Sequence, residues 1–448
     1  MTRIDEDKIT VIGRDSHDVE KFGTKGAILL GKQYIETAEK IVLANKIYLD
    51  VSGAHVVFIC GKRGGGKSYT MGVIAEGFSL LEEEVRENLS IILLDTMGIY
   101  WTMGHANHKE RELLEPYAID PRPVEVVIFT PKKFYYEYKK KGIRTDYPFS
   151  VDPSELEEDD WIKAFRQGKY DPNGIYISKV ITELKKQKDK YAIQDITDFI
   201  DNDKDSERDI KQAVKAMFKT SEGWGLFSDK STPLHVLAKG GAITVLDVSC
   251  YATMPGGWDV KALVVGLVAK HLFVQRMAFR KEEELHDIKY LESYFQEKTA
   301  VQAQKQEMPL VWLVIDEAHE FLPKNPEDWN TATEPLVTIM REGRQPGISL
   351  ILATQQPGKI HTDVMTQSDT VISHRITAKM DVEALGLLMQ SYMREGLQYH
   401  IDNLPRVKGA GVIFDDSNEK MYSMRIRPRF TWHGGASPSA VKEEKKNI

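Results

Sequence analysis

The pattern of apolar and polar positions divides the chain into regions with different expected structures. Residues 1 to about 52 alternate short apolar runs with glycines and charges, as in 9–13 and 26–31, and this pattern predicts short β-strands. From His55 onward the apolar runs become uniform, and helical stretches separate them. Such runs are typical of a mostly parallel sheet with helices on both faces. The sequence therefore predicts an α/β fold preceded by a small β-rich, barrel-like module.

Eight uniformly apolar runs are the predicted strands of this sheet: 55–60, 91–95, 125–130, 243–248, 309–315, 348–354, 370–376 and 411–414. Between them, charges and helical periodicity over 132–240 predict a mainly helical insertion. The expected domains are a β-rich module (1–52), a core in two parts (53–131 and 241–435), the insertion (132–240) and a charged tail (436–448).

One glycine-rich segment separates the first of these strands from a helix that begins near Tyr69, and the predicted nucleotide site runs from Gly61 to Tyr69. Its residues match G-x-x-x-x-G-K-[ST] without a gap: Gly61, Lys62, Arg63, Gly64, Gly65, Gly66, Lys67 and Ser68. Glycines let backbone N–H groups point into one concavity, and the helix adds its positive N-terminal end. Lys67 would reach the β- and γ-phosphates of ATP, and Ser68 would hold Mg²⁺. The strand–loop–helix context favours this phosphate-binding interpretation over a glycine-rich turn.

A second segment with candidate catalytic residues directly follows the strand at 309–315. The next two residues are Asp316 and Glu317, which lie at the carboxyl edge of the sheet, where open α/β sheets bind ligands. Asp316 would complete the Mg²⁺ shell through water, and Glu317 would orient and polarise the water that attacks the γ-phosphate. An acidic pair after a strand is by itself more often a helix N-terminus, but its combination with the glycine-rich segment favours the catalytic role.

Polar residues also follow the strand at 348–354. Gln355 would bridge the γ-phosphate or the attacking water to the next loop, whereas a solvated amide at a strand end is the alternative. Just before that strand, Arg341 and Arg344 are candidates for an arginine finger acting on a neighbouring subunit. A salt-bridged helix end is the alternative for both arginines, and the sequence does not choose between the two. Arg375 is a further candidate.

Composition narrows the class of protein. A hydrophobic content of 42% and a charged content of 28% are ordinary for a globular protein. No apolar run is expected to span a bilayer and no signal peptide is recognised, so a cytoplasmic location is predicted. The net charge of −7 argues against indiscriminate coating of nucleic acid but not against a locally basic channel. The two cysteines, Cys60 and Cys250, are expected to be reduced residues of the core.

The run Asp316-Glu317-Ala318-His319 suggests a two-lobed helicase, but the spacing of the motifs argues against one. About 250 residues separate Lys67 from Asp316, and only about 130 follow Glu317. This remainder has no room for a second motor lobe. A single lobe with an acceptor glutamate would complete its site with a neighbour, so a ring is the expected form.

These residues resemble the HerA/FtsK superfamily of ATP-driven DNA translocases, and its HerA branch in particular. The resemblance runs from about His55 to Gly435, with gaps across the insertion. Its most specific parts are 61–68, 93–100, 315–319, the run from Arg341 to Pro357, Arg375 to Thr377 with Asp381, and the closing segment 427–435. It implies a RecA-like P-loop NTPase core with an N-terminal barrel and a helical insertion. It further implies a hexamer around double-stranded DNA, a nuclease partner such as NurA, and a C-terminal segment that can reach an adjacent subunit.

Two departures from the family pattern stand out. Family members usually have an acidic residue where this chain has Ile99, in Asp95-Thr96-Met97-Gly98-Ile99-Tyr100. The polar role of that residue is therefore absent or moved. The N-terminal module, at roughly 50 residues, is also short for a complete barrel.

The segment 132–144 interleaves lysines with aromatic residues and is a candidate DNA contact. The alternative is a charged, exposed hairpin whose rings pack on the core. A second candidate is the loop with Lys359 and His361. For the whole protein, the main hypothesis is an ATP-hydrolysing translocase or helicase. The alternatives are an ATP-driven switch or scaffold that assembles a partner enzyme without processive movement, and an ATPase that pumps protein or DNA at a membrane.

Overall fold

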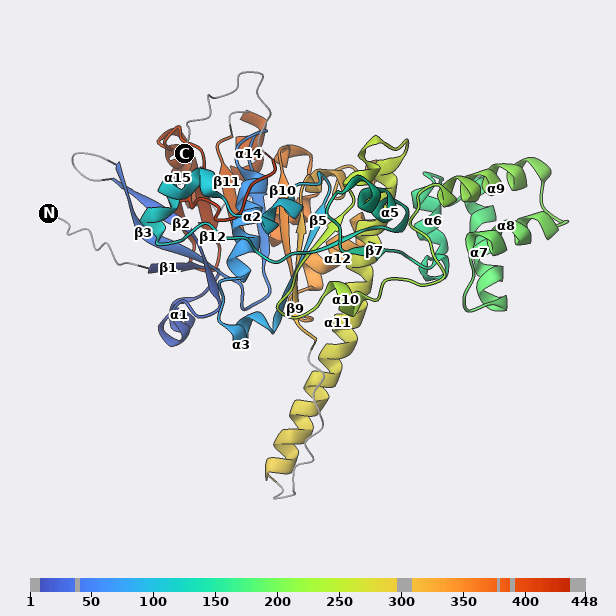
Figure 1. The fold of residues 1–448 in the computed structure, drawn as a ribbon, viewed down its shortest axis with the longest axis horizontal. Coiled ribbons are helices and arrows are strands. Elements are labelled where there is room, and N and C mark those ends of the chain that lie inside the picture. The colour runs from blue at the N-terminus through green and yellow to red at the C-terminus, as the bar shows by residue number, and fades with distance from the viewer. Residues whose placement is uncertain (1–8, 37–40, 296–307, 377–378, 387–390, 436–448) are drawn as a thin grey trace.

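The structure, a computed structural model, describes residues 9–36, 41–295, 308–376, 379–386 and 391–435 of the 448-residue chain. Its strands form one sheet in the order β1-β3-β2-β13-β12-β11-β4-β10-β9-β5-β8-β6-β7 (Figure 1). The strands are β1 (Ile9–Ile12), β2 (Ala27–Glu36), β3 (Ile41–Asp50), β4 (Val56–Cys60), β5 (Leu89–Asp95), β6 (Val127–Pro131), β7 (Tyr147–Phe149), β8 (Ile243–Asp247), β9 (Leu310–Ile315), β10 (Ile348–Thr354), β11 (Thr370–His374), β12 (Ala410–Asp415) and β13 (Lys420–Ile426).

Helices fill most of the connections between the strands. They are α1 (Ser16–Phe22), α2 (Lys67–Phe78), α3 (Glu83–Arg86), α4 (Arg111–Leu114), α5 (Lys132–Lys141), α6 (Glu158–Ala164), α7 (Pro172–Gln187), α8 (Ile193–Asn202), α9 (Arg208–Glu222), α10 (Leu234–Leu237), α11 (Gly257–Phe295), α12 (Thr333–Glu342), α13 (Thr362–Gln367), α14 (Lys379–Gly386) and α15 (Ser391–Asp402). Segment 132–141 is thus a helix, so the hairpin considered for it is wrong.

All neighbouring strands from β11 to β7 are parallel, whereas β12 and β13 are antiparallel to their neighbours. Successive side chains of the central strand β4 point to opposite faces of the sheet. Phe58 and Cys60 belong to the apolar cluster that contains residues of α11 and α12. Val57 and Ile59 belong to the cluster that contains residues of α2. A sheet with a core on each face explains the uniformly apolar runs, and the predicted mostly parallel α/β fold is confirmed.

The N-terminal strands continue this sheet. β2 pairs antiparallel with β13, in a register that sets Gly31 opposite Ile426. A Cβ on Gly31 would lie 2.0 Å from the Arg425 carbonyl oxygen, so the close approach of these two strands requires glycine. β13 was not among the predicted strands, and 411–414 was expected to close the set. No break in the sheet marks the predicted boundary near residue 52.

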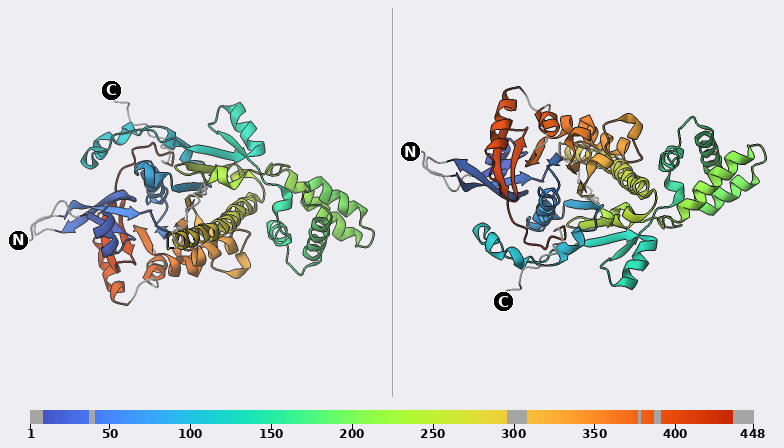
Figure 2. Two further views of the ribbon diagram at one scale, coloured as in Figure 1. Left: turned by 90° about the horizontal axis from the view of Figure 1, so that it is seen from below. Right: turned by 90° about the horizontal axis from the view of Figure 1, so that it is seen from above.

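The insertion and one long helix extend from the sheet (Figures 1 and 2). Helices α6 to α9 form a lobe at the end of the molecule opposite the N-terminal strands, whereas β7, from the same sequence region, pairs with β6 in the sheet. The first part of α11 packs on the sheet, and its second part projects from the body (Figure 1).

The apolar part of α11 corrects one expectation from the sequence. Within Gly257–Lys289, a window with a mean hydropathy of 1.4 is long and apolar enough to cross a membrane by length and composition. Of that window, 56% is buried inside the protein. The core helix of a globular protein passes the same test, so this single helix is weak evidence for a membrane segment.

Candidate nucleotide-binding site

The glycine-rich segment forms the turn between β4 and α2. Gly61, Gly64 and Gly66 have positive φ angles of 155°, 73° and 109°, values that side chains rarely permit. A Cβ on Gly61 would lie 2.7 Å from the Cβ of His374, the last residue of β11. α2 begins at Lys67, directly after Gly66. The segment therefore has the tight turn and the helix N-terminus that a phosphate cradle needs.

Lys67 is folded back onto the turn. Its Nζ donates hydrogen bonds to the carbonyl oxygens of Gly61, at 3.0 Å, and Lys62, at 3.4 Å, and only 7% of the residue is exposed. Arg63 is exposed at the tip of the turn. The carbonyl contacts hold the ammonium group in the concavity until a stronger acceptor, such as a phosphate oxygen, replaces them.

Ser68 and Asp316 meet across the sheet edge. The Ser68 hydroxyl donates a hydrogen bond to Asp316 Oδ2 at 2.6 Å, and the backbone N–H of Glu317 donates to Asp316 Oδ1 at 2.8 Å. A hydroxyl and a carboxylate are the hard oxygen ligands that Mg²⁺ prefers. These two groups therefore fit the metal site predicted for them, and Mg²⁺ bound there would neutralise phosphate charge.

Glu317 is held in an unusual state. Its backbone lies in the left-handed region, at φ 51° and ψ 43°, which is a strained conformation for a residue other than glycine. Gln355 Nε2 donates to Glu317 Oε1 at 3.2 Å, whereas the buried Oε2 has no hydrogen-bond partner in the described part of the chain. Burial, followed by the adjacent charge of Asp316, raises the pKa of Glu317. A carboxylate with a strained backbone and one oxygen that accepts no hydrogen bond is a candidate for a proton acceptor.

One residue beside Glu317, His319, had no role assigned to it from the sequence. His319, in the turn after β9, has its Nδ1 at 3.0 Å from Thr354 Oγ1 and 3.6 Å from Glu317 Oε2. Its Nε2 lies 3.1 Å from Gln356 Nε2. The histidine thus links the ends of β9 and β10, which only their proximity in the fold reveals.

His374 packs against the glycine turn and the first turn of α2. Its Nε2 lies 2.8 Å from Thr70 Oγ1 and its Nδ1 lies 3.3 Å from the Ala410 carbonyl oxygen. Burial of the ring lowers its pKa to about 4, so the ring is neutral at physiological pH. The next residue, Arg375, is half-buried at the same carboxyl edge of the sheet as the turn.

The arginines predicted to act in trans lie apart from this edge. Arg344 is exposed in the turn before β10, at the amino end of a strand that runs parallel to β4. Arg341, near the end of α12, pairs with Asp363 of α13, and this hydrogen bond raises the pKa of its guanidinium. The structure therefore does not bring either arginine to the glycine turn of its own chain.

A buried polar cluster lies beside the site, at the ends of β5 and β8. The Asp95 carboxylate accepts hydrogen bonds from the backbone N–H groups of four residues: Met97, Gly98, Ile99 and Tyr100. Asp247 is its partner in the register of the sheet. Burial, followed by the Asp247 charge, raises the pKa of Asp95. The Ile99 side chain packs against the apolar cluster on the α2 face, so at this position apolar packing replaces the family's acidic group.

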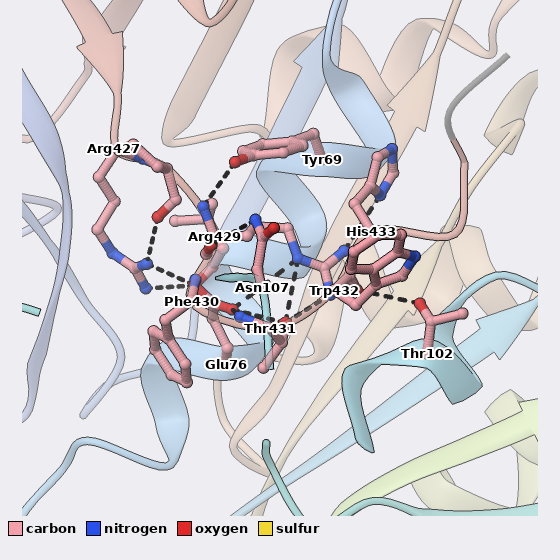
Figure 3. A network of polar contacts seen from close by, with 12 residues as sticks. Tyr69, Glu76, Thr102, Asn107, Arg427, Arg429, Phe430, Thr431, Trp432 and His433 are labelled. Carbon is pink, nitrogen blue, oxygen red and sulfur yellow. Dashed lines mark hydrogen bonds and ion pairs between the residues drawn. The ribbon is translucent and has the colours of Figure 1, made fainter. Parts of the chain in front are cut away.

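The closing segment packs on α2 of its own chain (Figure 3). The fully buried Glu76 pairs with Arg427, which is itself fully buried. Glu76 also accepts hydrogen bonds from the backbone N–H groups of Phe430, at 3.2 Å, and Thr431, at 3.0 Å, and from the Thr431 hydroxyl, at 2.7 Å. As far as Gly435, the segment is therefore bound to the helix that carries Lys67 and Ser68.

Tyr69 connects this network to the site. Its hydroxyl donates to Glu110 Oε2 at 2.6 Å and accepts from the Arg429 backbone N–H at 2.6 Å. Its ring meets His433 edge-on, with centroids 5.2 Å apart. Tyr69, predicted as part of the nucleotide site, thus directly follows the glycine-rich segment in sequence and contacts the closing segment (Figure 3).

Comparisons with known proteins concern the family and the fold of this chain. The family model of the HerA helicase central domain matches residues 39–272, just over half of the chain, and a model of the zonular occludens toxin matches residues 252–384. The solved structure of VirB4 from Thermoanaerobacter pseudethanolicus is 11% identical, with a TM-score of 0.53, and the match covers 90% of this chain and 97% of that protein. At that identity the likeness concerns the fold alone.

Two relatives carry the HerA name. The probable DNA double-strand break repair helicase HerA of Methanocaldococcus jannaschii is 23% identical over 364 residues, which are 75% of this chain and 65% of the relative. The DNA double-strand break repair helicase HerA of Pyrococcus furiosus is 28% identical over 156 residues, which are 34% of this chain and 27% of the relative. The chain thus spans 65% and 27% of the lengths of these relatives. By its family model and its fold, this chain belongs to the HerA helicase family of P-loop ATPases.

Proposed function

We propose that this protein hydrolyses ATP with Mg²⁺ and uses the energy to move along double-stranded DNA as a hexameric ring. The observation that carries the proposal is the convergence of Ser68, Asp316, Glu317 and Gln355 at one edge of the sheet. They come from the P-loop and from the ends of two strands, more than two hundred residues away from it in sequence.

The proposed chemistry follows from the side chains at this edge. Lys67 would exchange its carbonyl partners for the β- and γ-phosphates. Ser68 and Asp316 would hold the metal ion. Glu317 would accept the proton of the attacking water, for which its raised pKa is suited. Gln355, already bonded to Glu317, would keep that carboxylate and the water in line with the γ-phosphate.

The positions of the arginines support a ring. Because Arg341 and Arg344 lie away from their own glycine turn, either can act only on the nucleotide of a neighbouring subunit. Arg341 would first have to leave Asp363, whereas Arg344 is exposed. This difference favours Arg344 as the finger that needs the smaller rearrangement.

Helix α5 is the proposed DNA contact. Lys132 and Lys133 are engaged with Ser228 Oγ and the Gly223 carbonyl oxygen. Lys140 and Lys141 are exposed at the other end of the helix and can meet phosphates, whose neutralisation releases counterions. The relatives are named for double-strand break repair, so DNA end processing with a NurA-like nuclease, in the cytoplasm, is part of the proposal.

The first test measures ATP hydrolysis with and without duplex DNA over a range of salt concentrations. Turnover should rise with DNA, and the stimulation should fall with salt because phosphate contacts release counterions. Lys67→Ala should abolish turnover, and Lys324→Ala, at an exposed lysine outside the site, is the matched control. Slow hydrolysis whose rate does not change with DNA, together with ATP-dependent oligomerisation, would instead support the alternative function as an ATP-driven switch or scaffold.

The second test examines the assembly by negative-stain imaging with a non-hydrolysable ATP analogue. A six-fold ring with a hole wide enough for a duplex supports the translocase. Monomers at high protein concentration contradict it.

A further inference from the structure

A cavity next to the P-loop helix has no assigned role in the chemistry described above. It has a volume of about 600 Å³, and it is lined by Gly98, Trp101, Thr102, His105, Trp432 and Gly434. The first four residues belong to the turn after β5, and the last two belong to the closing segment. A volume in this range is typical of pockets for small molecules.

The walls of the cavity are fixed in place. Thr102 Oγ1 lies 3.0 Å from the Trp432 carbonyl oxygen and accepts a hydrogen bond from the Gly434 N–H at 3.1 Å. The Trp432 N–H donates to the His105 carbonyl oxygen at 2.7 Å. A Cβ on Gly434 would lie 2.8 Å from Thr102 Cγ2, so this close approach requires glycine. The two segments are therefore joined through the Thr102 hydroxyl and through backbone groups, and these bonds do not involve the side chains of Trp101, His105 and Trp432.

The lining is aromatic and partly open to solvent. Trp432 is 43% exposed, and His105 is exposed next to the half-buried Trp101, with a ring-centroid distance of 5.9 Å. Exposed indole rings in a pocket favour flat, π-rich ligands, because stacking gains contact area without requiring a charge partner.

The cavity is joined to the P-loop through two residues. Tyr69 directly follows Ser68, and its ring contacts His433 at 5.2 Å. His433 lies between Trp432 and Gly434 in sequence, and Figure 3 shows Trp432 and His433 between Tyr69 and Thr102. A contact from Tyr69 to His433 therefore links the residue that follows the P-loop to the segment that lines the cavity.

We propose that the cavity is the base-binding subsite for the nucleoside triphosphate held by the P-loop of the same chain, with Trp432 and Trp101 stacking on the nucleobase. The proposal rests on the proposed ATP site. Its consequence is that the closing segment senses the nucleotide directly: the base binds beside Trp432, and Arg427 and Thr431 of the same segment are anchored on Glu76 of α2.

Calorimetric titration with two ligands, ATP and inorganic tripolyphosphate, both with Mg²⁺, tests the proposal. The wild-type protein should bind ATP about tenfold or more tightly than tripolyphosphate, a difference that stacking of one base supplies. Trp432→Ala should weaken ATP binding by about the same factor and leave tripolyphosphate binding within twofold. Trp432→Phe should restore most of the loss, because a phenyl ring still stacks. Trp329→Ala, at an exposed tryptophan outside the cavity (38% exposed), is the matched control.

The outcomes separate the two proposals. If Lys67→Ala weakens both ligands but Trp432→Ala changes neither, the P-loop site stands and the base subsite is overturned. If Lys67→Ala affects neither ligand, the phosphate site fails, and the subsite that rests on it fails as well. If Trp432→Ala weakens binding of a DNA oligonucleotide but not of ATP, the cavity belongs to DNA and the proposal is wrong.

Discussion

Two glutamates near the P-loop helix differ in how completely their carboxylate oxygens are hydrogen-bonded. Glu76 of α2 is fully buried, pairs with Arg427 and accepts further hydrogen bonds from Phe430 and Thr431. Glu317 is partly exposed and accepts one hydrogen bond, from Gln355, while its Oε2 has no hydrogen-bond partner among the described residues.

This difference distinguishes a carboxylate that stabilises the fold from one that is a candidate for catalysis. A buried carboxylate is tolerated when all its lone pairs are bound, and such a network stabilises one arrangement of the chain. A carboxylate with a free oxygen and a raised pKa is costly for folding but is able to accept a proton. Glu76 therefore anchors the closing segment, and Glu317 has the free oxygen that its proposed role as a proton acceptor requires.

His55 is another buried group whose polar atoms are bound, as those of Glu76 are. His55, before β4, lies between Asp369 Oδ2, at 2.8 Å from its Nδ1, and Asp50 Oδ2, at 3.4 Å from its Nε2. Asp50 also pairs with the buried Arg14. Burial of the ring opposes its charged form, but the bonds to Asp369 and Asp50 outweigh it and raise the pKa of His55 to about 9. This cluster joins the N-terminal strands to the core.

The largest expected effect is on turnover. Glu317→Gln should lower the rate of ATP hydrolysis by about 10²- to 10⁴-fold, the range for loss of a general base, while ATP binding is retained. Because the raised pKa of Glu317 means that folding disfavours its charged form at neutral pH, the amide should unfold at the same or a higher denaturant concentration. Steady-state kinetics and denaturant unfolding measure the two effects. If Glu317→Gln lost stability but kept its turnover, Glu317 would have the structural role that is assigned to Glu76.

Glu76→Gln should show the opposite pattern. Removing one partner of a fully buried ion pair leaves Arg427 uncompensated and should cost about 3–5 kcal/mol of unfolding free energy. Combining it with Arg427→Met should recover part of this loss, which a double-mutant cycle in urea would measure. A loss below about 1 kcal/mol would contradict the structural role given to Glu76.

The contribution of the His55 cluster to stability can be measured through its dependence on pH. Because the folded-state pKa of about 9 lies above the unfolded value of about 6.5, the contribution of His55 is fully present below pH 6.5. It is lost as the pH rises through about 9, and it should amount to on the order of 3 kcal/mol. Denaturant midpoints measured between pH 6 and 10 should fall in the wild-type protein and fall less in His55→Gln. Equal slopes in the two proteins would show that the histidine is not charged in the folded state.

The smallest expected effect concerns Gln355. Gln355→Ala removes one hydrogen bond to the Glu317 carboxylate and should lower turnover by up to about tenfold, with unfolding unchanged. Gln356→Ala, which removes a contact to His319, is the neighbouring comparison. A loss as large as that of Glu317→Gln would mean that Gln355 is itself essential for the chemistry.

The sequence predicts most of the sheet and the residues at its carboxyl edge because their signals are local. Lys67 and Ser68 belong to one contiguous motif, and Asp316, Glu317 and Gln355 directly follow apolar strands. Parallel strands bring such ends together without any knowledge of packing.

What the sequence does not reveal depends on distant pairs. Glu76 and Arg427 are 351 residues apart, and no sequence pattern around either residue indicates that the two form an ion pair. The Asp95 and Asp247 pair is set by strand register. β13 lies between β2 and β12 in the sheet, but it is only half-buried and its alternation is weak. The cavity at Trp101 and Trp432 likewise forms only when the closing segment packs on the turn after β5.

The most direct test of the account is a structure of the protein with a non-hydrolysable ATP analogue and Mg²⁺. The account predicts that the triphosphate lies along the glycine turn, with Ser68 and Asp316 at the metal and the Glu317 carboxylate in contact with a water that faces the terminal phosphorus. A Glu317 side chain directed away from that phosphorus, with no water between them, would contradict it.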